Sequence, residues 1–484
     1  MDEKSLKSKT VSGILWKFGE NGLNQIIQFV LSIVLARLLL PEDYGLIALV
    51  TVFITLCDKL VVSGFATSLI QKKDADGKDF STVFWFSLGM SLALYALLYF
   101  GAPLIADFYN TYDRENLIAV IRVMGLQVIM VAVNSVQSAY VSKTMQFKRF
   151  FWSNLGGTVL SAVVGILMAL RGFGVWALVA QYLVKMLGSM CVLWFTVKWR
   201  PTLDFSVQRF KALFAYGWKI FAASIIKVLY NDLRSLVIGK FYAPTDLAYY
   251  NRGQSFPQII DSNITGTIDS VFFPTMSHAQ SSKETMLAML RRTVQVSMFI
   301  LTPLLFGLAA VAKPLVLVLL TEKWLPCVFY LQILSLSFAL SPLEIENLQA
   351  IKAAGRSDIV LKLEIVKRTL GTVLLFAAVP FGVEWIAVSL LIGNVLSAFI
   401  NAFPNRKLLG YSYRQQLADI LPPLVLSAGM YGSVWLVSLI SLPPFAALCL
   451  QIVVGMGAYI LLAAITRNKS FLYILQMLKG FLKK

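Results

Sequence analysis

Polar side chains recur within a long apolar stretch near the start of the chain, residues 16–45. Their spacing of three and four residues places them on one face of a helix. The stripe consists of Lys17, Glu20, Asn21, Asn24, Gln25 and Gln28. Because hydrogen-bonding groups are costly against lipid, we expect this stripe to face other helices or water inside the protein. The amides also suit a plainer role, since such side chains hold helices together by hydrogen bonds.

The apolar stretch 213–238 contains cationic residues. Lys227 and Arg234 lie close to one helical face of this segment. An unpaired cation deep in a membrane helix is costly, so we interpret both residues as lining a cavity. Alternatively, Arg234 forms an internal ion pair with the nearby Asp232.

The next stretch, 247–271, carries a longer polar stripe at steps of three and four residues. Its members are Asn251, Arg252, Gln254, Ser255, Gln258, Asp261, Ser262, Thr265 and Asp269. Asp261 also occupies the position that repeats Asp58 of the stretch 44–66. We expect the polar faces of these four helices to line a central wet cavity. Arg252 lies near a predicted span end, where a long cation can instead reach the membrane interface.

Composition places these stripes in a polytopic membrane protein. Hydrophobic residues make up 58% of the 484 residues and charged residues only 14%, whereas a soluble domain carries about 25% charged residues. Apolar segments of roughly twenty residues recur from end to end and predict an all-α fold with about fourteen transmembrane helices. They fall within 13–38, 44–66, 82–106, 117–141, 153–170, 175–197, 213–238, 247–271, 293–312, 327–350, 364–380, 385–404, 417–440 and 444–466.

Lysine and arginine residues concentrate in alternate loops, beginning with the N-terminal segment. The positive-inside rule therefore places both termini in the cytoplasm and requires an even number of spans. The net charge of +18 has the same explanation, because cytoplasmic loops face anionic lipid. We expect membrane lipids as partners and no nucleic acid.

The chain contains an internal repeat. The residues Trp-Lys at 16–17 return at 218–219, and the pattern Pro-x-Asp at 41–43 returns at 244–246. The basic loop 198–211 precedes the second copy. Because equivalent spans have the same orientation, we expect two six-helix lobes related by a pseudo-twofold axis along the membrane normal. The predicted parts are an N-terminal lobe at 1–209, a C-terminal lobe at 210–404, and two extra spans with an amphipathic cytoplasmic tail at 405–484.

Enzyme signatures are absent from the sequence. The only histidine, His278, lies in a predicted loop without a metal-binding cluster. The four cysteines have neither metal-ligand nor disulfide spacing, and no P-loop motif occurs. We therefore expect a protein that is not an enzyme and that needs no metal and no cofactor.

Four motifs carry a family resemblance: 11–16 (VSGILW), 35–45 (LARLLLPEDYG), 64–73 (GFATSLIQKK) and 320–324 (LTEKW). The third looks like the pattern G-x-x-x-[SA]-[LI]-I-Q-[RK]-K, and the fourth looks like G-E-K-W with Thr321 in place of the glycine. With these motifs the chain resembles the MOP flippase superfamily. Within it, the chain is most similar to the polysaccharide-transporter branch of O-antigen, colanic-acid and teichuronic-acid type flippases. The resemblance covers essentially the whole chain.

The resemblance implies a two-lobed bundle with a V-shaped central cavity. It also implies a transporter that flips a polyprenyl-pyrophosphate-linked oligosaccharide across the cytoplasmic membrane by alternating access, for export of a cell-surface polysaccharide. The lipid-linked oligosaccharide would be the cargo, and polymerase or export machinery a further partner. Related flippases carry cavity arginines on their first, second and eighth spans, whereas here the first span offers Lys17 and Arg37 only at its ends.

The polar residues suit three roles in such a transporter. For the diphosphate, cations are required, and the candidates are Lys227, Arg234 and Arg252. For the sugars, amides and hydroxyls are required, and the candidates are Asn24, Gln25, Gln28, Gln254, Ser255 and Gln258. For coupling to protons or sodium, the candidates are Asp58, Asp261 and Asp269. Glu344 and Glu346 offer further cation sites or partners for Lys352.

Three alternatives remain open on the sequence. A multidrug/cation antiporter of the sister branch requires acidic cavities, which the carboxylates of 247–271 supply and the cations of 213–238 oppose. A polysaccharide polymerase or ligase requires a long outer loop with clustered arginines or histidine, which the sequence lacks. A non-transporting scaffold of the assembly complex does not require the polar stripes.

Overall fold

The computed structural model describes residues 3–62, 68–70, 72, 74–280 and 282–482, and every regular element in them is helical. Several side chains in α1, α8 and α18, including those of Lys17, Asn21 and Lys219, lie outside the described part. By compactness the chain forms an N-terminal unit, Met1–Ala248, and a C-terminal unit, Tyr249–Lys484. The division falls within the first turns of α9 (Pro244–His278).

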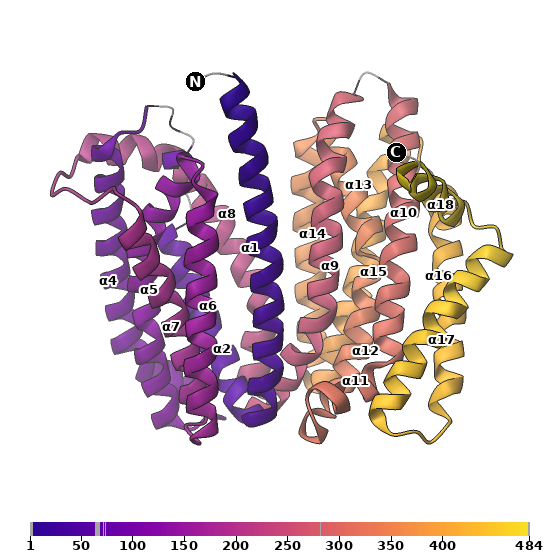
Figure 1. Cartoon of the computed structure of the whole chain (residues 1–484), viewed down its shortest axis with the longest axis horizontal. Helices are drawn as coiled ribbons and strands as arrows, with labels where there is room; N and C mark the ends of the chain where they lie inside the picture. Colours follow the sequence, from indigo (N-terminus) through magenta and orange to yellow (C-terminus); the bar gives the residue numbers. More distant parts are fainter. Residues whose placement is uncertain (1–2, 63–67, 71, 73, 281, 483–484) are drawn as a thin grey trace. The chain divides into compact units, whose positions relative to one another are not determined.

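The N-terminal unit contains the first seven long helices (Figure 1). These are α1 (Glu3–Leu38), α2 (Pro41–Val62), α4 (Gly77–Phe108), α5 (Arg114–Lys143), α6 (Phe147–Leu170), α7 (Val175–Thr196) and α8 (Val207–Phe241). α6 packs closely on α7, where a Cβ on Gly157 would lie 2.5 Å from the carbonyl oxygen of Lys185. Small residues at this crossing let two membrane helices approach backbone to backbone. α8 packs on α2 and α4 in this unit, while the predicted lobe boundary at 209 rests on the repeat and stays a prediction.

The C-terminal unit continues from α9 with helices that differ more in length. These are α10 (Lys283–Ala310), α11 (Ala312–Leu319), η1 (Glu322–Trp324), α12 (Cys327–Phe338), α13 (Ser341–Ala353), α14 (Ser357–Ala378), η2 (Val379–Phe381), α15 (Val383–Leu408), α16 (Tyr413–Ser438), α17 (Pro444–Ile465) and α18 (Lys469–Leu482). The predicted span 327–350 is two helices in the structure. Pro342 explains this division, because a proline is favoured in the first turn of a helix and disfavoured in its interior.

Helix pairs recur between the two units. In the N-terminal unit α4 packs on α5, α5 on α7, and α6 on α7. In the C-terminal unit α10 packs on α12 and α13, these pack on α15, and α14 packs on α15. The order of the pairs along the chain is the same, with α12 and α13 together taking the place of α5. The helices α4 to α7 are therefore packed in the same order as α10 to α15.

The repeated Pro-x-Asp pattern starts equivalent helices in the same way. Pro41 begins α2, and the backbone N–H of Leu40 donates to the Asp43 carboxylate at 3.1 Å. Pro244 begins α9, and the backbone N–H of Ala243 donates to the Asp246 carboxylate at 3.2 Å. Proline fits the first helical position, and an acceptor at the third position satisfies the N–H of the capping residue. The sequence repeat thus specifies the start of the second helix of each copy.

Every predicted span coincides with helix. In the described part of the chain, 10 helical segments are long and apolar enough to cross a membrane, and residues Gly22–Leu38 add a shorter apolar segment. α9 and α14 are long enough but fall outside this set, because polar or charged residues interrupt them. The chain is a multi-pass membrane protein, and the all-α polytopic fold class is confirmed.

Candidate functional site

α8 holds the two predicted cavity cations of the N-terminal unit. Arg234 is only 9% exposed, and its Nε atom is buried without a hydrogen-bond partner among the described residues. Lys227 lies about 10 Å earlier along the helix on nearly the same face and is exposed. Both residues are described, and no ion pair joins Arg234 to Asp232 in that part of the chain. A buried guanidinium with an unused donor is well suited to bind an anionic partner.

The predicted amide stripe of α1 is divided between two environments. Glu20 is buried, and its carboxylate accepts a hydrogen bond from the side-chain amide of Asn154 in α6. Asn24 and Gln28 are half-buried, and the side-chain oxygen of Asn24 has no partner among the described residues. Gln25 is exposed. Glu20 therefore joins α1 to α6, while the three amides keep hydrogen-bonding capacity for a ligand.

Asp58 of α2 is half-buried and contacts α5. The side-chain amide of Gln127 donates to its Oδ2 atom at 3.0 Å. The Oδ1 atom is buried without a hydrogen-bond partner in the described chain. A carboxylate within a membrane helix is a site for a proton or a cation unless its charge is paired. Among the described residues Asp58 has an amide partner but no ion pair.

Asp261 of α9 has the equivalent arrangement in the C-terminal unit. Its Oδ1 atom accepts a hydrogen bond from the hydroxyl of Ser341, the first residue of α13. α13 belongs to the pair of helices that corresponds to α5. Each repeat-related carboxylate thus receives one neutral hydrogen bond from the equivalent neighbouring helix. Asp269 lies two turns further along α9 and has one buried oxygen without a partner among the described residues.

The remaining predicted residues of α9 lie in its first half. Arg252 is half-buried, and its guanidinium carbon lies 5.1 Å from the centroid of the Trp324 ring. Gln254 and Ser255 are half-buried, and Gln258 is exposed. The Ser255 hydroxyl donates to the backbone carbonyl of Arg252 at 2.8 Å, within the same helix. Such bonds within a helix satisfy a hydroxyl group in a membrane without a partner on another helix.

Trp324 explains the LTEKW motif. Its side chain is fully buried and packs edge-to-face on Tyr249, with ring centroids 6.0 Å apart. Thr321 precedes it with φ +88° and ψ 172°, a conformation found almost only for glycine. This conformation explains why the related pattern has glycine here, and in this chain the threonine is strained. The motif builds a turn that places Trp324 beneath Arg252.

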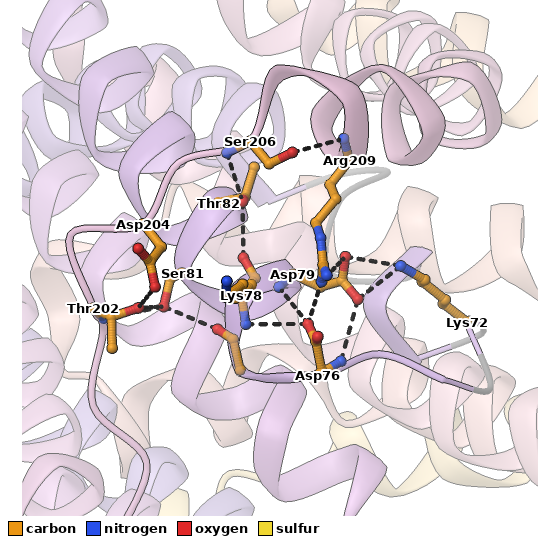
Figure 2. Close-up of polar contacts among 11 residues, drawn as sticks. Lys72, Asp76, Lys78, Asp79, Ser81, Thr82, Thr202, Asp204, Ser206 and Arg209 are labelled. Atoms are coloured by element: carbon orange, nitrogen blue, oxygen red, sulfur yellow. Dashed lines mark hydrogen bonds and ion pairs between the residues drawn. The ribbon is translucent and has the colours of Figure 1, made fainter.

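The GFATSLIQKK motif ends in an ion cluster that joins the connections on one side of the N-terminal unit. Residues 63–67, 71 and 73 lie outside the described part. Lys72 contacts the fully buried carboxylate of Asp79 at 2.7 Å, and Arg209 approaches the same carboxylate at 3.3 Å. Figure 2 shows Asp79 between these two cations, with Arg209 also paired to Asp76. Because a buried charge must be paired, we interpret this cluster as structural.

The same cluster extends into the chain segment before α8. Ser81 and Thr202 share a hydrogen bond of 3.1 Å (Figure 2). The indole N–H of Trp85 donates to the backbone carbonyl of Thr202 at 2.7 Å. The hydroxyl of Ser206 caps α8 by accepting from the N–H of Arg209. The start of α4 is therefore tied to the start of α8, which carries the two predicted cavity cations.

Sequence reasoning missed a buried charge network in the C-terminal unit. Lys367 of α14 contacts Glu344 of α13 at 3.0 Å and Glu364 of its own helix at 2.8 Å. Glu344 was expected to bind a cation or to pair with Lys352, and its ion-pair partner in the described chain is Lys367 instead. The available signal was the spacing of Lys367 three residues after Glu364 inside a predicted span. Glu346 is 2% exposed and accepts a 3.4 Å hydrogen bond from Ser297.

The predicted site residues are distributed over the two units. Those of α1, α2 and α8 belong to the N-terminal unit, and those of α9 that were singled out belong to the C-terminal unit. Within each unit the structure brings a repeat-related carboxylate next to a hydrogen-bond donor, and in the N-terminal unit it leaves buried polar atoms of Arg234 and Asn24 without a partner among the described residues. These arrangements can bind an anionic group and a polar cargo and can carry protons or cations.

Comparison with solved structures identifies the fold. The fold matches that of the lipid II flippase MurJ in an inward closed conformation with a TM-score of 0.77, over 94% of this chain and 98% of that one, at 13% identity. It also matches an inward-facing multidrug resistance MATE family transporter of the MOP superfamily with a TM-score of 0.66, over 80% of this chain and 94% of that one, at 18% identity. The chain therefore shares the fold of these two transporters.

The sequence profile of the family described as "Polysaccharide biosynthesis protein" matches residues 34–329, and the chain belongs to this family. It is 26% identical over 456 residues to the succinoglycan biosynthesis transport protein ExoT of Rhizobium meliloti (strain 1021), covering 93% of this chain and 87% of the relative. It is 25% identical over 439 residues to the teichuronic acid biosynthesis protein TuaB of Bacillus subtilis (strain 168), covering 88% of both. The lipopolysaccharide biosynthesis protein WzxC of Escherichia coli (strain K12) is 26% identical over 436 residues, covering 87% of this chain and 86% of the relative.

Proposed function

We propose that this protein flips a polyprenyl-pyrophosphate-linked oligosaccharide across the cytoplasmic membrane by alternating access, for export of a cell-surface polysaccharide. The observation that carries the proposal is the family match over most of the chain, together with relatives named for transport and biosynthesis of bacterial polysaccharides. The likeness to MurJ supports a fold able to do this. The relatives have different polysaccharides in their names, so the class of cargo follows and the particular glycan does not.

The diphosphate of the cargo would bind Arg234, Lys227 and Arg252. Arg234 supports this role because it is buried with an unused donor, and a guanidinium forms charge-assisted hydrogen bonds with phosphate. The sugars would bind the polar side chains of α1 and α9, which are Asn24, Gln25, Gln28, Gln254, Ser255 and Gln258. The polyprenyl chain would stay in the bilayer.

Energy for transport would come from coupling to protons or sodium at Asp58, Asp261 and Asp269. Two of these carboxylates have a buried oxygen without a hydrogen-bond partner in the described chain. The third, Asp261, accepts only from the Ser341 hydroxyl among the contacts described for its side chain. A carboxylate without an ion-pair partner in a membrane helix can bind a proton or a cation, which neutralises its charge.

The protein would lie in the cytoplasmic membrane with both termini in the cytoplasm. The alternation of basic loops supports this orientation. We further propose that it acts without enzymatic chemistry and passes its cargo to polymerase or export machinery on the outer side.

The proposal is tested in cells that lack this protein. We expect lipid-linked oligosaccharide to accumulate on the inner leaflet, where added periplasmic glycan-modifying enzymes cannot reach it, and a plasmid copy to restore access. Normal surface polysaccharide in the deletion strain, together with greater sensitivity to cationic drugs, would contradict the proposal and favour the antiporter. Accumulation of unpolymerised oligosaccharide on the outer leaflet would favour a polymerase.

A further inference from the structure

A basic cavity lies in the C-terminal unit where α18 meets α10. Its volume is about 320 Å³. Three of the described residues that line it are cationic and none is acidic. The lining consists of Ala288, Arg291, Arg292, Gln295, Val296, Lys469, Ser470 and Tyr473. A cavity with this lining attracts an anion.

The two adjacent arginines of α10 have different partners. Arg291 forms a bidentate ion pair with Asp419 of α16, at 2.8 Å for each contact. Arg292 instead stacks on Tyr473 of α18, with its guanidinium carbon 3.5 Å from the ring centroid. Stacking on a ring face leaves the N–H groups at the edge of the guanidinium free to donate in its plane. Arg292 and the exposed Lys469 therefore supply the charge that the protein does not neutralise.

Apolar side chains of α18 pack against the rest of the C-terminal unit. Phe471 and Ile474 pack against a buried cluster that includes Phe299 and Tyr459. The Asn468 side chain caps the first turn by accepting from the N–H groups of Ser470 and Phe471, at 2.9 and 3.3 Å. The cavity is thus built by packing and capping within the chain, and side chains rather than free helix amides supply the donors.

The hydropathy of α10 indicates that the cavity lies at the level of lipid headgroups. The long apolar part of α10 begins at Val294, one residue after the two arginines. On α18, Leu472 and Leu475 are exposed, as expected of an amphipathic helix at a membrane interface. Basic pockets at this level of a membrane protein bind phosphate-containing headgroups.

We propose that this cavity binds the phosphate of an anionic membrane phospholipid, with the phosphate between Arg292 and Lys469. The hydroxyls of Ser470 and Tyr473 lie in the same lining and would donate to the remaining headgroup oxygens. The bound lipid would fasten α18 to α10. None of the residues that line this cavity is among those proposed to bind the cargo, and its occupancy does not depend on flipping.

The test uses the full-length protein, purified in neutral detergent and depleted of lipid. Binding of phosphatidylglycerol with a fluorescent tail is measured by anisotropy, with phosphatidylcholine carrying the same label as the neutral reference. Lys469→Gln changes one exposed side chain and should not disturb folding, and Arg292→Gln removes the second cation. The matched control is Arg406→Gln with Lys407→Gln, two exposed cations at the end of α15.

We expect phosphatidylglycerol to bind more tightly than phosphatidylcholine, and binding to weaken about fivefold for each cation removed from the cavity. The control variant should bind as the wild type does. Equal binding of both lipids, or equal weakening by the control, would overturn the proposal. Full displacement of the labelled lipid by millimolar inorganic phosphate would also overturn it, because the site would then belong to the free ion.

Discussion

The side-chain amide of Gln127 donates a 3.0 Å hydrogen bond to the carboxylate of Asp58 and leaves the other carboxylate oxygen buried without a partner in the described chain. Asp261, which repeats Asp58 in the second copy, likewise accepts a hydrogen bond from a neutral donor, the hydroxyl of Ser341. A carboxylate in a membrane helix that lacks an ion pair responds to the arrival of a proton or cation.

Asp58→Asn and Asp261→Asn should each make the site permanently neutral while keeping a hydrogen-bond acceptor. We expect export of lipid-linked oligosaccharide to slow by about tenfold or more and to lose its response to a protonophore or to sodium removal, because the coupling group no longer changes charge. The measurement is the transport rate in cells with and without the gradient. Asp74→Asn, an exposed carboxylate in a connection, is the control. A gradient response that persists in both variants would exclude these carboxylates as coupling sites.

Thr321→Gly should stabilise the protein. Thr321 has φ +88° and ψ 172°, and a non-glycine residue in that region costs on the order of 1–3 kcal/mol. We expect the thermal unfolding midpoint in detergent to rise. Thr466→Gly, at an ordinary φ of −76°, is the matched control and should give no increase. An unchanged or lower midpoint for Thr321→Gly would mean that the surrounding turn does not have this strained backbone.

The ion cluster around Asp79 should respond unequally to single and double substitutions. Lys72→Ala leaves Arg209 beside the buried carboxylate, so its effect should be modest. Lys72→Ala with Arg209→Ala leaves the charge unpaired and should cost about 3–5 kcal/mol of unfolding free energy. Adding Asp79→Asn should recover most of that loss.

The control for this series is Arg356→Ala, which breaks the exposed pair with Asp358 and should cost less than about 1 kcal/mol. Denaturant unfolding of the purified variants gives these values. If the double variant were as stable as Lys72→Ala alone, the cluster would not hold the two connections together.

Acid should weaken the same cluster through Asp76. The hydrogen bond from Arg209 holds the pKa of this carboxyl below its usual value of 3.8. A carboxyl with a lowered pKa contributes stability above its unfolded pKa, and that contribution is lost as the pH falls through the folded value. We therefore expect the thermal unfolding midpoint to decrease when the pH is lowered below about 4. The decrease should be smaller in Asp76→Asn. A wild type and a variant with identical pH profiles would contradict this assignment.

The helices and their order could be predicted from the sequence because hydropathy and turn residues are local signals. The Pro-x-Asp repeat at Pro41 and Pro244 also predicted equivalent helix starts, since capping depends on neighbouring residues. The division between α12 and α13 was missed. Pro342 was its local sign, but the apolar run across it was long enough for one span.

Partners between helices could not be predicted in the same way. Lys352 was the near neighbour of Glu344 in sequence, yet Lys367 on another helix forms the ion pair. The partner of Glu20 is Asn154, far along the chain. Such pairs depend on which helix faces pack together, and periodicity within one helix defines a face without naming its neighbour.

Arg234 is the residue on which the proposed cargo site depends most. Its guanidinium is 9% exposed with a buried Nε that has no partner among the described residues. The most direct measurement is the flipping rate of a polyprenyl-pyrophosphate-linked oligosaccharide in reconstituted vesicles. We predict that Arg234→Gln slows flipping by about tenfold or more, that Arg234→Lys retains part of the rate, and that the exposed control Lys211→Gln leaves it unchanged. A wild-type rate in correctly folded Arg234→Gln protein would contradict the account.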